Sequence, residues 1–394
     1  MNQHFSRQTR ALRSGIGADS AHGAVIPPLY LSSNFTFEEF GRPRPYDYTR
    51  SGNPTRDQLA DALAILEAGA GATVVATGLA AITLCVTALV PSGGRVVAPH
   101  DCYGGSWRLF THMAHQGHIE VEFIDFTDPD ALAASLSREP ALVWIETPSN
   151  PLLRITDIAA VADASRAAGA LTVADNTFCS PMLQRPLDLG CDVVVHSTTK
   201  FINGHSDVVG GAAIARDQGV HERLRHWANV LGLTGSPFDS YLALRGLRTL
   251  DARLAVHATN TAALVDLAVG HEAVAAVHYP GLASHPGHEI ASRQQSGYGS
   301  LFSIDLAGGE RAAREFLIGL ELFDLAESLG GVESLVAHPA TMTHASMTPE
   351  ARHAAGIGDG LLRFSVGIEQ QADLESAFTA ALARAGQHLS PEPS

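Results

Sequence analysis

The chain has 394 residues, which is more than one ordinary domain needs and enough to bury a large hydrophobic core. Hydrophobic residues make up 45% of it and charged residues 17%, a composition that excludes a disordered or fibrous protein. The formal net charge of -15 repels nucleic acid and anionic membranes, and no run of Lys and Arg interrupts it, so neither is an expected partner.

The start of the chain predicts an extended arm. Residues 1–56 are rich in Pro, Gly, Ser and aromatic residues and show no sustained period. Residues 1–13 contain three arginines but no apolar stretch, so we expect no secretory signal. The apolar run at residues 72–90 is interrupted by Gly78 and several threonines, which favours a buried strand and helix over a membrane span.

From residue 57 onward, helical and strand patterns alternate. Leu59, Leu63 and Leu66 have helical spacing, and short apolar runs separated by helical stretches follow them. The expected strands are residues 73–76, 95–98, 120–124, 142–146, 171–174, 192–195 and 212–215. This alternation predicts an α/β domain over residues 57–255 with a mostly parallel sheet and crossover helices.

The last part of the chain has a different pattern. Residues 241–269 show a long helical period, and the later apolar segments at 300–306 and 361–366 alternate as in half-buried strands. We therefore place a boundary near residue 255 and expect a smaller α+β domain over residues 256–394.

The cysteine pattern bears on the compartment. The four cysteines show no C-x-x-C spacing, and a chain of this length does not need disulfides for stability; they are Cys85, Cys102, Cys179 and Cys191. We expect a protein of the reducing cytoplasm.

Two neighbouring strand ends carry groups suited to chemistry, and ligands of open parallel sheets bind at such ends. The strand at 171–174 is followed by Asp175, and the strand at 192–195 by Lys200. A carboxylate and a lysine so placed could form a structural ion pair. They are also the two groups that pyridoxal 5'-phosphate needs: a desolvated amine that bonds to its aldehyde, and a carboxylate that keeps its ring nitrogen protonated.

Further residues suit the other parts of that cofactor. Gly78 and Leu79 lie where a strand turns into a helix, so their N–H groups could bind a phosphate. The hydroxyls of Ser197 and Thr199 add donors. Tyr103 follows another strand end, where its ring could stack on a planar ligand or simply pack in a loop.

Four segments together resemble the Cys/Met-metabolism family of pyridoxal-phosphate enzymes, and the resemblance spans nearly the whole chain. They are DYTRSGNPTR from residue 47, DNTF from 175, HSTTKFINGHSD from 196 and AESLGGVES from 326. The resemblance implies the pyridoxal-phosphate-dependent transferase fold type I, with pyridoxal 5'-phosphate as the cofactor and Lys200 and Tyr103 as catalytic residues.

The resemblance also implies roles for residues outside the strand ends. Arg363 corresponds to the family's arginine for the substrate α-carboxylate, a role that suits a bidentate guanidinium. Tyr48 and Arg50 correspond to residues that reach the cofactor phosphate of a neighbouring subunit, which implies obligate dimers paired into a homotetramer. The remaining implied substrate contacts are Asn150, Ser328, Glu327 and Arg108.

The activity that the resemblance implies is γ-replacement on an acyl ester of homoserine. Lys200 moves the α-proton and later a β-proton, the acyloxy group leaves, and cysteine sulfur adds. Tyr103 would suit proton transfer as well as stacking. Elimination of cystathionine and sulfhydrylation of the ester stay open as alternatives, whereas Gly105 replaces a cysteine characteristic of methionine γ-lyases. Ser51 replaces an arginine found in some enzymes that use the succinyl ester, although Arg108 is retained, so both succinyl and acetyl esters stay open.

Other classes of function have less support. A catalytically silent binding protein on this fold would be expected to lose Lys200, Asp175 or Arg363, and all three are present. We expect no metal, because the histidines at 112, 115 and 118 lack the H-E-x-x-H pattern. No G-x-S-x-G or G-x-G-x-x-G follows a strand, which argues against a hydrolase or a nicotinamide enzyme.

Overall fold

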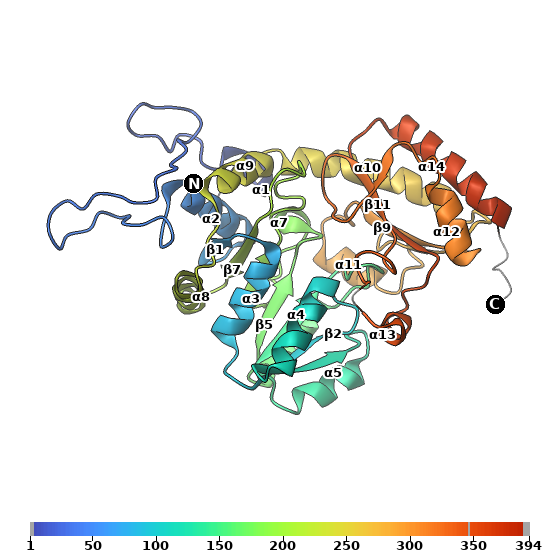
Figure 1. The fold of residues 1–394 in the computed structure, drawn as a ribbon, viewed down its shortest axis with the longest axis horizontal. Helices are drawn as coiled ribbons and strands as arrows, with labels where there is room; N and C mark the ends of the chain where they lie inside the picture. The colour runs from blue at the N-terminus through green and yellow to red at the C-terminus, as the bar shows by residue number, and fades with distance from the viewer. Residues whose placement is uncertain (1–3, 346, 389–394) are drawn as a thin grey trace.

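A seven-stranded sheet forms the centre of the larger domain in the computed structural model, which describes residues 4–345 and 347–388 (Figure 1). The strand order is β1-β7-β6-β5-β4-β2-β3; β7 is antiparallel to both neighbours, and the other pairs are parallel. The strands are β1 (Gly71–Val75), β2 (Gly94–Pro99), β3 (Ile119–Ile124), β4 (Leu142–Glu146), β5 (Leu171–Asp175), β6 (Val193–His196) and β7 (Gly211–Ala215). The mostly parallel sheet is confirmed, and the seven expected strands lie within two residues of these bounds.

Helices cover both faces of this sheet, because successive side chains of a strand point to opposite faces. Trp144 packs in a cluster with α3, α4 and α8, whereas its neighbours Val143 and Ile145 pack with α5 and α6. These helices are α3 (Gly78–Leu89), α4 (Gly104–His115), α5 (Pro129–Leu136), α6 (Ile158–Ala167) and α8 (Gln218–Leu231). The apolar run at 72–90 is the buried strand β1 followed by α3, as expected. Among the described residues, no helix combines the length and apolar character needed to cross a membrane.

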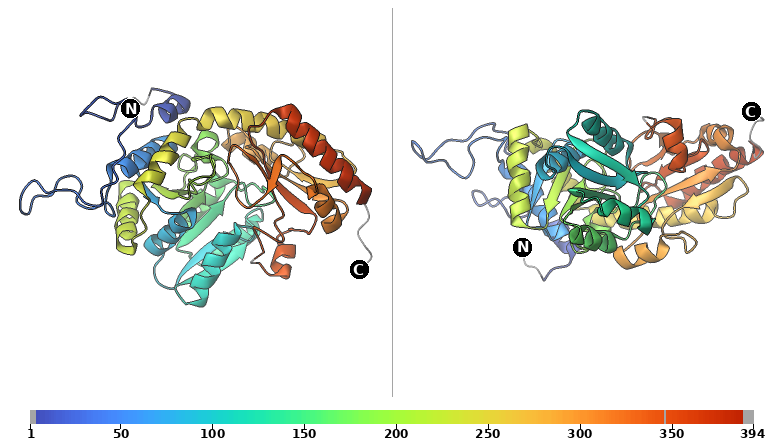
Figure 2. Two further views of the ribbon diagram at one scale, coloured as in Figure 1. Left: turned by 45° about the horizontal axis from the view of Figure 1, so that its top comes forward. Right: turned by 90° about the horizontal axis from the view of Figure 1, so that it is seen from below.

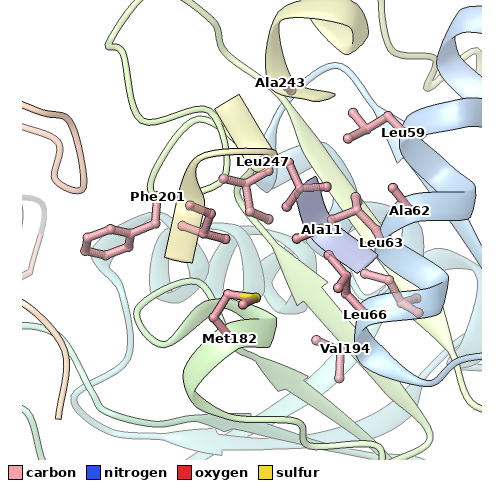
Figure 3. Close-up of a cluster of buried hydrophobic side chains, with 14 of the residues drawn as sticks. Ala11, Leu59, Ala62, Leu63, Leu66, Met182, Val194, Phe201, Ala243 and Leu247 are labelled. Atoms are coloured by element: carbon pink, nitrogen blue, oxygen red, sulfur yellow. The ribbon is translucent and has the colours of Figure 1, made fainter. Parts of the chain in front are cut away.

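A second cluster holds the first long helix against the segment that carries Lys200. Leu59, Leu63 and Leu66 lie on one face of α2 (Pro54–Glu67), as their spacing predicts, and pack in a cluster that includes Phe201 (Figure 3). The shorter helices that contribute to this cluster are α1 (Arg7–Arg13), α7 (Ser180–Leu183) and α9 (Pro237–Leu247). Because Phe201 directly follows Lys200, this packing fixes the backbone at the lysine.

The expectation of one long helix over residues 241–269 is wrong. The helix is interrupted between α9 and α10 (Leu250–Ala268), and the interruption lies where the two helices meet the loop after Lys200. A Cβ at Gly246 would lie 2.1 Å from the carbonyl oxygen of Asn203, so the backbones touch there. The buried Arg253 guanidinium donates to the carbonyl oxygens of Gly246 (3.0 Å) and Phe201 (2.8 Å), which satisfies the end of α9. Helix α10 runs through the expected boundary at residue 255, and that boundary stays a prediction.

The C-terminal part forms a five-stranded sheet with helices, as expected for an α+β domain. Its strand order is β10-β11-β12-β9-β8, antiparallel except for β10 and β11. The elements are β8 (Val274–His278), α11 (His288–Gln294), β9 (Leu301–Leu306), α12 (Gly309–Leu317), β10 (Phe323–Leu325), β11 (Ser334–Ala337), α13 (Pro349–Ala354), β12 (Leu361–Ser365), α14 (Gln371–Ala385) and a 3-10 turn at Gly386–His388. Strand β12 places Phe364 in the core of this domain, and the adjacent Arg363 therefore faces the other way, toward the large domain.

The arm leaves the body of the molecule. Residues 15–53, all of them described, contain no helix or strand beyond two isolated bridges, and the loops extend away from the sheet (Figures 1 and 2). Large apolar side chains on the arm face solvent, including Val25, Leu31 and Phe40. Apolar exposure of this extent is typical of a surface that contacts another protein chain.

Replacing Phe364 by alanine should lower the free energy of unfolding by about 3–5 kcal/mol, because the buried ring packs among four other phenylalanines. Urea unfolding followed by far-UV circular dichroism measures this loss. The control is Leu325→Ala in the same domain, whose half-exposed side chain should contribute less than about 0.5 kcal/mol. Equal losses in the two variants would contradict this description of the core.

Candidate active site

A cavity of about 400 Å³ opens at the carboxyl ends of the parallel strands, between the two domains. This volume falls in the ordinary range for small-molecule sites. Eleven of the residues singled out in the sequence line it: Gly78, Leu79, Tyr103, Asn150, Asp175, Ser197, Thr199, Lys200, Glu327, Ser328 and Arg363. The large domain supplies the first eight and the C-terminal domain the last three, so both domains contribute to the lining.

Lys200 lies in the loop after β6, and its Nζ donates a hydrogen bond to Ser328 Oγ at 2.7 Å. Burial and, to a smaller extent, the nearby Arg363 guanidinium lower the pKa of this amine, whereas Glu327 opposes them, and the resulting pKa is about 8. At pH 7 about a tenth of the amine is therefore uncharged, and the uncharged amine is the nucleophilic form. Lys200 is also the only lysine in the sequence, so no other lysine side chain competes for an aldehyde.

Asp175 is the last residue of β5 and lines the same cavity as Lys200. Its Oδ1 accepts a hydrogen bond from the Thr177 N–H at 3.0 Å. Burial raises the pKa of this carboxyl, and the hydrogen bonds from Thr177 oppose the rise. A buried carboxyl of this kind is stabilised in its ionised form by a cation such as a protonated ring nitrogen.

The start of α3 offers donors for a phosphate. Thr77 Oγ1 accepts from the Ala80 N–H at 2.8 Å and the Thr77 carbonyl accepts from the Ala81 N–H at 3.2 Å, whereas Gly78 and Leu79 line the cavity. The first N–H groups of a helix have no partner within the helix, so those of Gly78 and Leu79 can bind an anion. A Cβ at Gly78 would lie 2.7 Å from that of Ser197, so no larger residue fits there.

Arg363 is buried and carries an incomplete set of partners. Its Nη1 donates to Asn150 Oδ1 and its Nη2 to the Ser328 carbonyl, both at 2.8 Å. Its Nε is buried without a hydrogen-bond partner in the described part of the chain. Burial lowers the pKa of the guanidinium to about 10, so it is still a cation at neutral pH. A buried cation with a free donor at a cavity wall is suited to a carboxylate.

Ser328 connects the two cationic side chains. Its hydroxyl accepts from Lys200 and its carbonyl from Arg363, and its backbone φ is 101°, a value that L-residues rarely adopt. Such strain is found where the surrounding contacts fix the backbone, and here those contacts belong to the cavity.

Three of the expected site residues do not line the cavity: Arg108, Tyr48 and Arg50. Arg108 is exposed on α4. Tyr48 and Arg50 lie on the extended arm, where Arg50 Nη1 donates to the Asn229 carbonyl at 2.9 Å and the guanidinium lies 5.8 Å from the Tyr48 ring centroid. Their own chain does not bring them to its cavity.

The cavity also contains residues that the sequence reasoning missed, such as Glu146, Phe178 and Thr343. Glu146 closes β4, so the rule that functional residues follow buried strands would have found it. Phe178 follows Asp175 closely, whereas Thr343 comes from an irregular segment with no sequence signal. Within the described residues no group of His, Cys, Asp and Glu is arranged to hold a metal ion, and all four cysteines are free and buried.

Pyridoxal 5'-phosphate fits this set of groups. The cavity has one amine for the aldehyde at Lys200, one buried carboxyl for the ring nitrogen at Asp175, and free N–H groups for the phosphate at the start of α3. The Arg363 guanidinium at the cavity is then left for a substrate carboxylate.

Comparison with known proteins gives matches along the chain. The family model of Cys/Met metabolism PLP-dependent enzymes matches residues 8–383. Cystathionine γ-synthase of Escherichia coli (strain K12) is 53% identical over 377 residues, which cover 95% of this chain and 98% of that protein. A cystathionine γ-lyase of Dictyostelium discoideum is 45% identical over 380 residues, which cover 95% of this chain and 97% of that one.

Solved structures are similar over the same length. The crystal structure of cystathionine γ-synthase from Xanthomonas oryzae pv. oryzae in complex with cystathionine has a TM-score of 0.97 and 60% sequence identity, and covers 98% of this chain and 100% of that one. These values place the two chains in the same fold, which is fold type I.

The pKa of Lys200 can be measured directly because the chain contains no other lysine. In the cofactor-free protein, trapping of a small uncharged aldehyde with cyanoborohydride should modify Lys200 with a rate that rises with pH and is half-maximal near pH 8, since only the uncharged amine reacts. Peptide mass mapping separates this adduct from one at the amino terminus. A rate still rising tenfold per pH unit above pH 9 would show an amine of ordinary pKa and contradict the burial argument.

Proposed function

Because the chain belongs to the family of Cys/Met-metabolism PLP-dependent enzymes, we propose that it is a cystathionine γ-synthase, which joins cysteine to an O-acylated homoserine and releases the acid. The observation that carries the proposal is the convergence of Lys200, Asp175 and Arg363 on one cavity built from both domains. The similarity to γ-synthases along nearly the whole chain supports the choice within the family.

The cavity residues singled out above have distinct roles in this reaction. When bound, pyridoxal 5'-phosphate supplies an aldehyde that bonds to amines and a cationic ring that absorbs the electron pair left by a departing proton. Asp175 keeps the ring nitrogen protonated, and the N–H groups of Gly78 and Leu79, with the hydroxyls of Ser197 and Thr199, hold the phosphate. Lys200 Nζ, with its pKa near 8, accepts the substrate α-proton and can return a proton to a neighbouring carbon.

The substrate is oriented from the side of the C-terminal domain. Arg363, held by Asn150 and by the Ser328 carbonyl, binds the α-carboxylate through the donors that the protein leaves free. Burial raises the pKa of the Tyr103 phenol, so at neutral pH its O–H is a hydrogen-bond donor at the cavity. Glu327, which lines the cavity, and Arg108, which lies outside its lining, are the residues that we assign to the distal part of the substrate or the incoming cysteine.

Related activities are the competing candidates. Relatives named cystathionine γ-lyase and cystathionine β-lyase are 45% and 42% identical to this chain, so elimination from cystathionine is the first competing activity. Transfer of inorganic sulfide to the same ester is the other alternative. Ser51 leaves the choice between succinyl and acetyl esters to experiment, because its hydroxyl donates to Asp47 and supplies no cation for a distal carboxylate.

We also propose a homotetramer in which the arm of one subunit completes the site of another, and a cytoplasmic location. The exposed apolar side chains of the arm and the distance of Tyr48 and Arg50 from their own cavity support exchange between subunits. The four free cysteines suit a reducing compartment.

Product analysis tests the proposed reaction. The purified protein with pyridoxal phosphate should convert O-succinylhomoserine or O-acetylhomoserine, together with cysteine, to cystathionine, as measured by mass spectrometry. Parallel reactions with sulfide, and with cystathionine alone, are the controls for the alternatives. If only cystathionine reacts, giving cysteine, 2-oxobutanoate and ammonia, the protein is a lyase and the proposal is wrong.

Mixed oligomers test the exchange of arms. Arg50→Ala and Lys200→Ala should each have little activity. When the two variants are unfolded together and refolded, half of the dimers are mixed, and each mixed dimer has one site with an intact lysine and an intact arm, so about a quarter of the wild-type activity should return. If Arg50 acts in the cavity of its own chain, no mixed dimer contains an intact site and activity does not return.

A further inference from the structure

Glu146 is a buried acid at the cavity that the proposed mechanism does not use. It ends β4, it is 6% exposed, and both of its carboxyl oxygens lie 3.0 Å from the backbone nitrogen of Tyr103. The N–H of Asn150 also donates to this carboxyl. One side chain therefore binds the backbone of two residues that line the cavity.

Those two backbone positions control groups that face the ligand. Tyr103 precedes α4 and makes no side-chain capping bond, so the direction of its ring follows from its backbone. The ring lies against the first turn, because a Cβ at Gly105 would be 2.4 Å from it, and a Cβ at Gly104 would be 2.5 Å from the Thr343 carbonyl oxygen. The Tyr103 N–H has its hydrogen bond to Glu146 in place of a helical one.

The second backbone position leads to the carboxylate site. Asn150 Oδ1 accepts from Arg363 Nη1, so the position of the Asn150 backbone determines how the guanidinium is presented. Two hydrogen bonds therefore connect Glu146 to the Arg363 guanidinium. Glu146 accepts from the Asn150 N–H, and Asn150 Oδ1 accepts from Arg363 Nη1.

The acid also lies beside Asp175. The two residues are partners in the parallel pairing of β4 and β5, so two carboxyls end adjacent buried strands. Burial, with the charge of Asp175, raises the pKa of Glu146 well above its ordinary value. The N–H bonds from Tyr103 and Asn150 oppose this rise, because they stabilise the charged form of the carboxyl.

We propose that Glu146 is a positioning residue that holds the backbone of Tyr103 and Asn150 in one arrangement, and so sets the aromatic ring and the Arg363 carboxylate site relative to each other. The proposal rests on the proposed function only for the choice of substrate. The positioning role itself depends only on hydrogen bonds within the protein and not on the identity of the substrate.

The test compares Glu146→Gln and Glu146→Asp with a matched control. In the glutamine variant one acceptor oxygen is replaced by an NH₂ group, so the Tyr103 and Asn150 N–H groups must share the remaining oxygen. The control is Asp192→Asn: Asp192 Oδ2 accepts from the Thr172 N–H at 2.9 Å, but at the opposite, amino end of the same sheet. Both changes remove one carboxyl that binds a neighbouring backbone N–H.

Hydrogen exchange of the cofactor-free protein is the first measurement. The Tyr103 and Asn150 amides should exchange about tenfold faster in Glu146→Gln, the effect of losing roughly one hydrogen bond, with no such change in Asp192→Asn. In the loaded enzyme, Glu146→Gln should raise KM for the amino-acid substrate about 10- to 100-fold, with a smaller fall in kcat, and should change the visible circular dichroism of the bound cofactor. Glu146→Asp should recover part of each loss.

Several results would overturn the proposal. Unchanged exchange at Tyr103 and Asn150 would show that the hydrogen bonds do not hold these residues. Equal effects of Glu146→Gln and Asp192→Asn would mean general loss of stability, and so would failure of both Glu146 variants to fold. If the wild-type protein makes no cystathionine, the proposed function fails instead, and the exchange and circular dichroism measurements still decide the role of Glu146.

Discussion

Two cationic side chains, the buried Arg363 and the partly buried Lys200, line one cavity, and this is the constraint on which the site depends. Lys200 and Arg363 come from different domains, the charge of Arg363 lowers the pKa of Lys200, and both side chains are bound to Ser328. A buried cation without an anion is costly. Anionic groups of a ligand would offset this cost, which explains how a chain with a net charge of -15 can still bind a phosphate and a carboxylate.

The fold produces this arrangement by simple means. Parallel strands end at one edge of the sheet, so the residues that follow β4, β5 and β6 meet there without any special loop. The C-terminal domain adds β12, whose alternation places Phe364 in a packed core and Arg363 at the cavity. Because Phe364 and Arg363 are neighbours in one short strand, the packing of Phe364 in the aromatic core also fixes the backbone that carries the guanidinium.

The sequence predicted those features that depend on local patterns. The strand at residues 142–146 and the roles of strand ends follow from short apolar runs, and the family motifs identified Arg363. The break between α9 and α10 was missed, because it depends on Arg253 satisfying carbonyl groups of a distant loop, and such a contact leaves no period in the sequence. Thr343 was missed for the same reason. The burial of the Arg363 side chain could not be predicted either, because a single arginine in a short apolar segment has the sequence pattern of a surface charge.

The central claim is that Lys200 and Asp175 hold opposite sides of one pyridoxal phosphate ring. The most direct measurement is to add the cofactor to the protein, reduce with borohydride and map the modified peptide. The account predicts a visible absorption band that reduction abolishes, with the reduced cofactor on Lys200, and a band of altered position or intensity in Asp175→Asn. A protein that the cofactor does not colour, or a label only at the amino terminus, would contradict it.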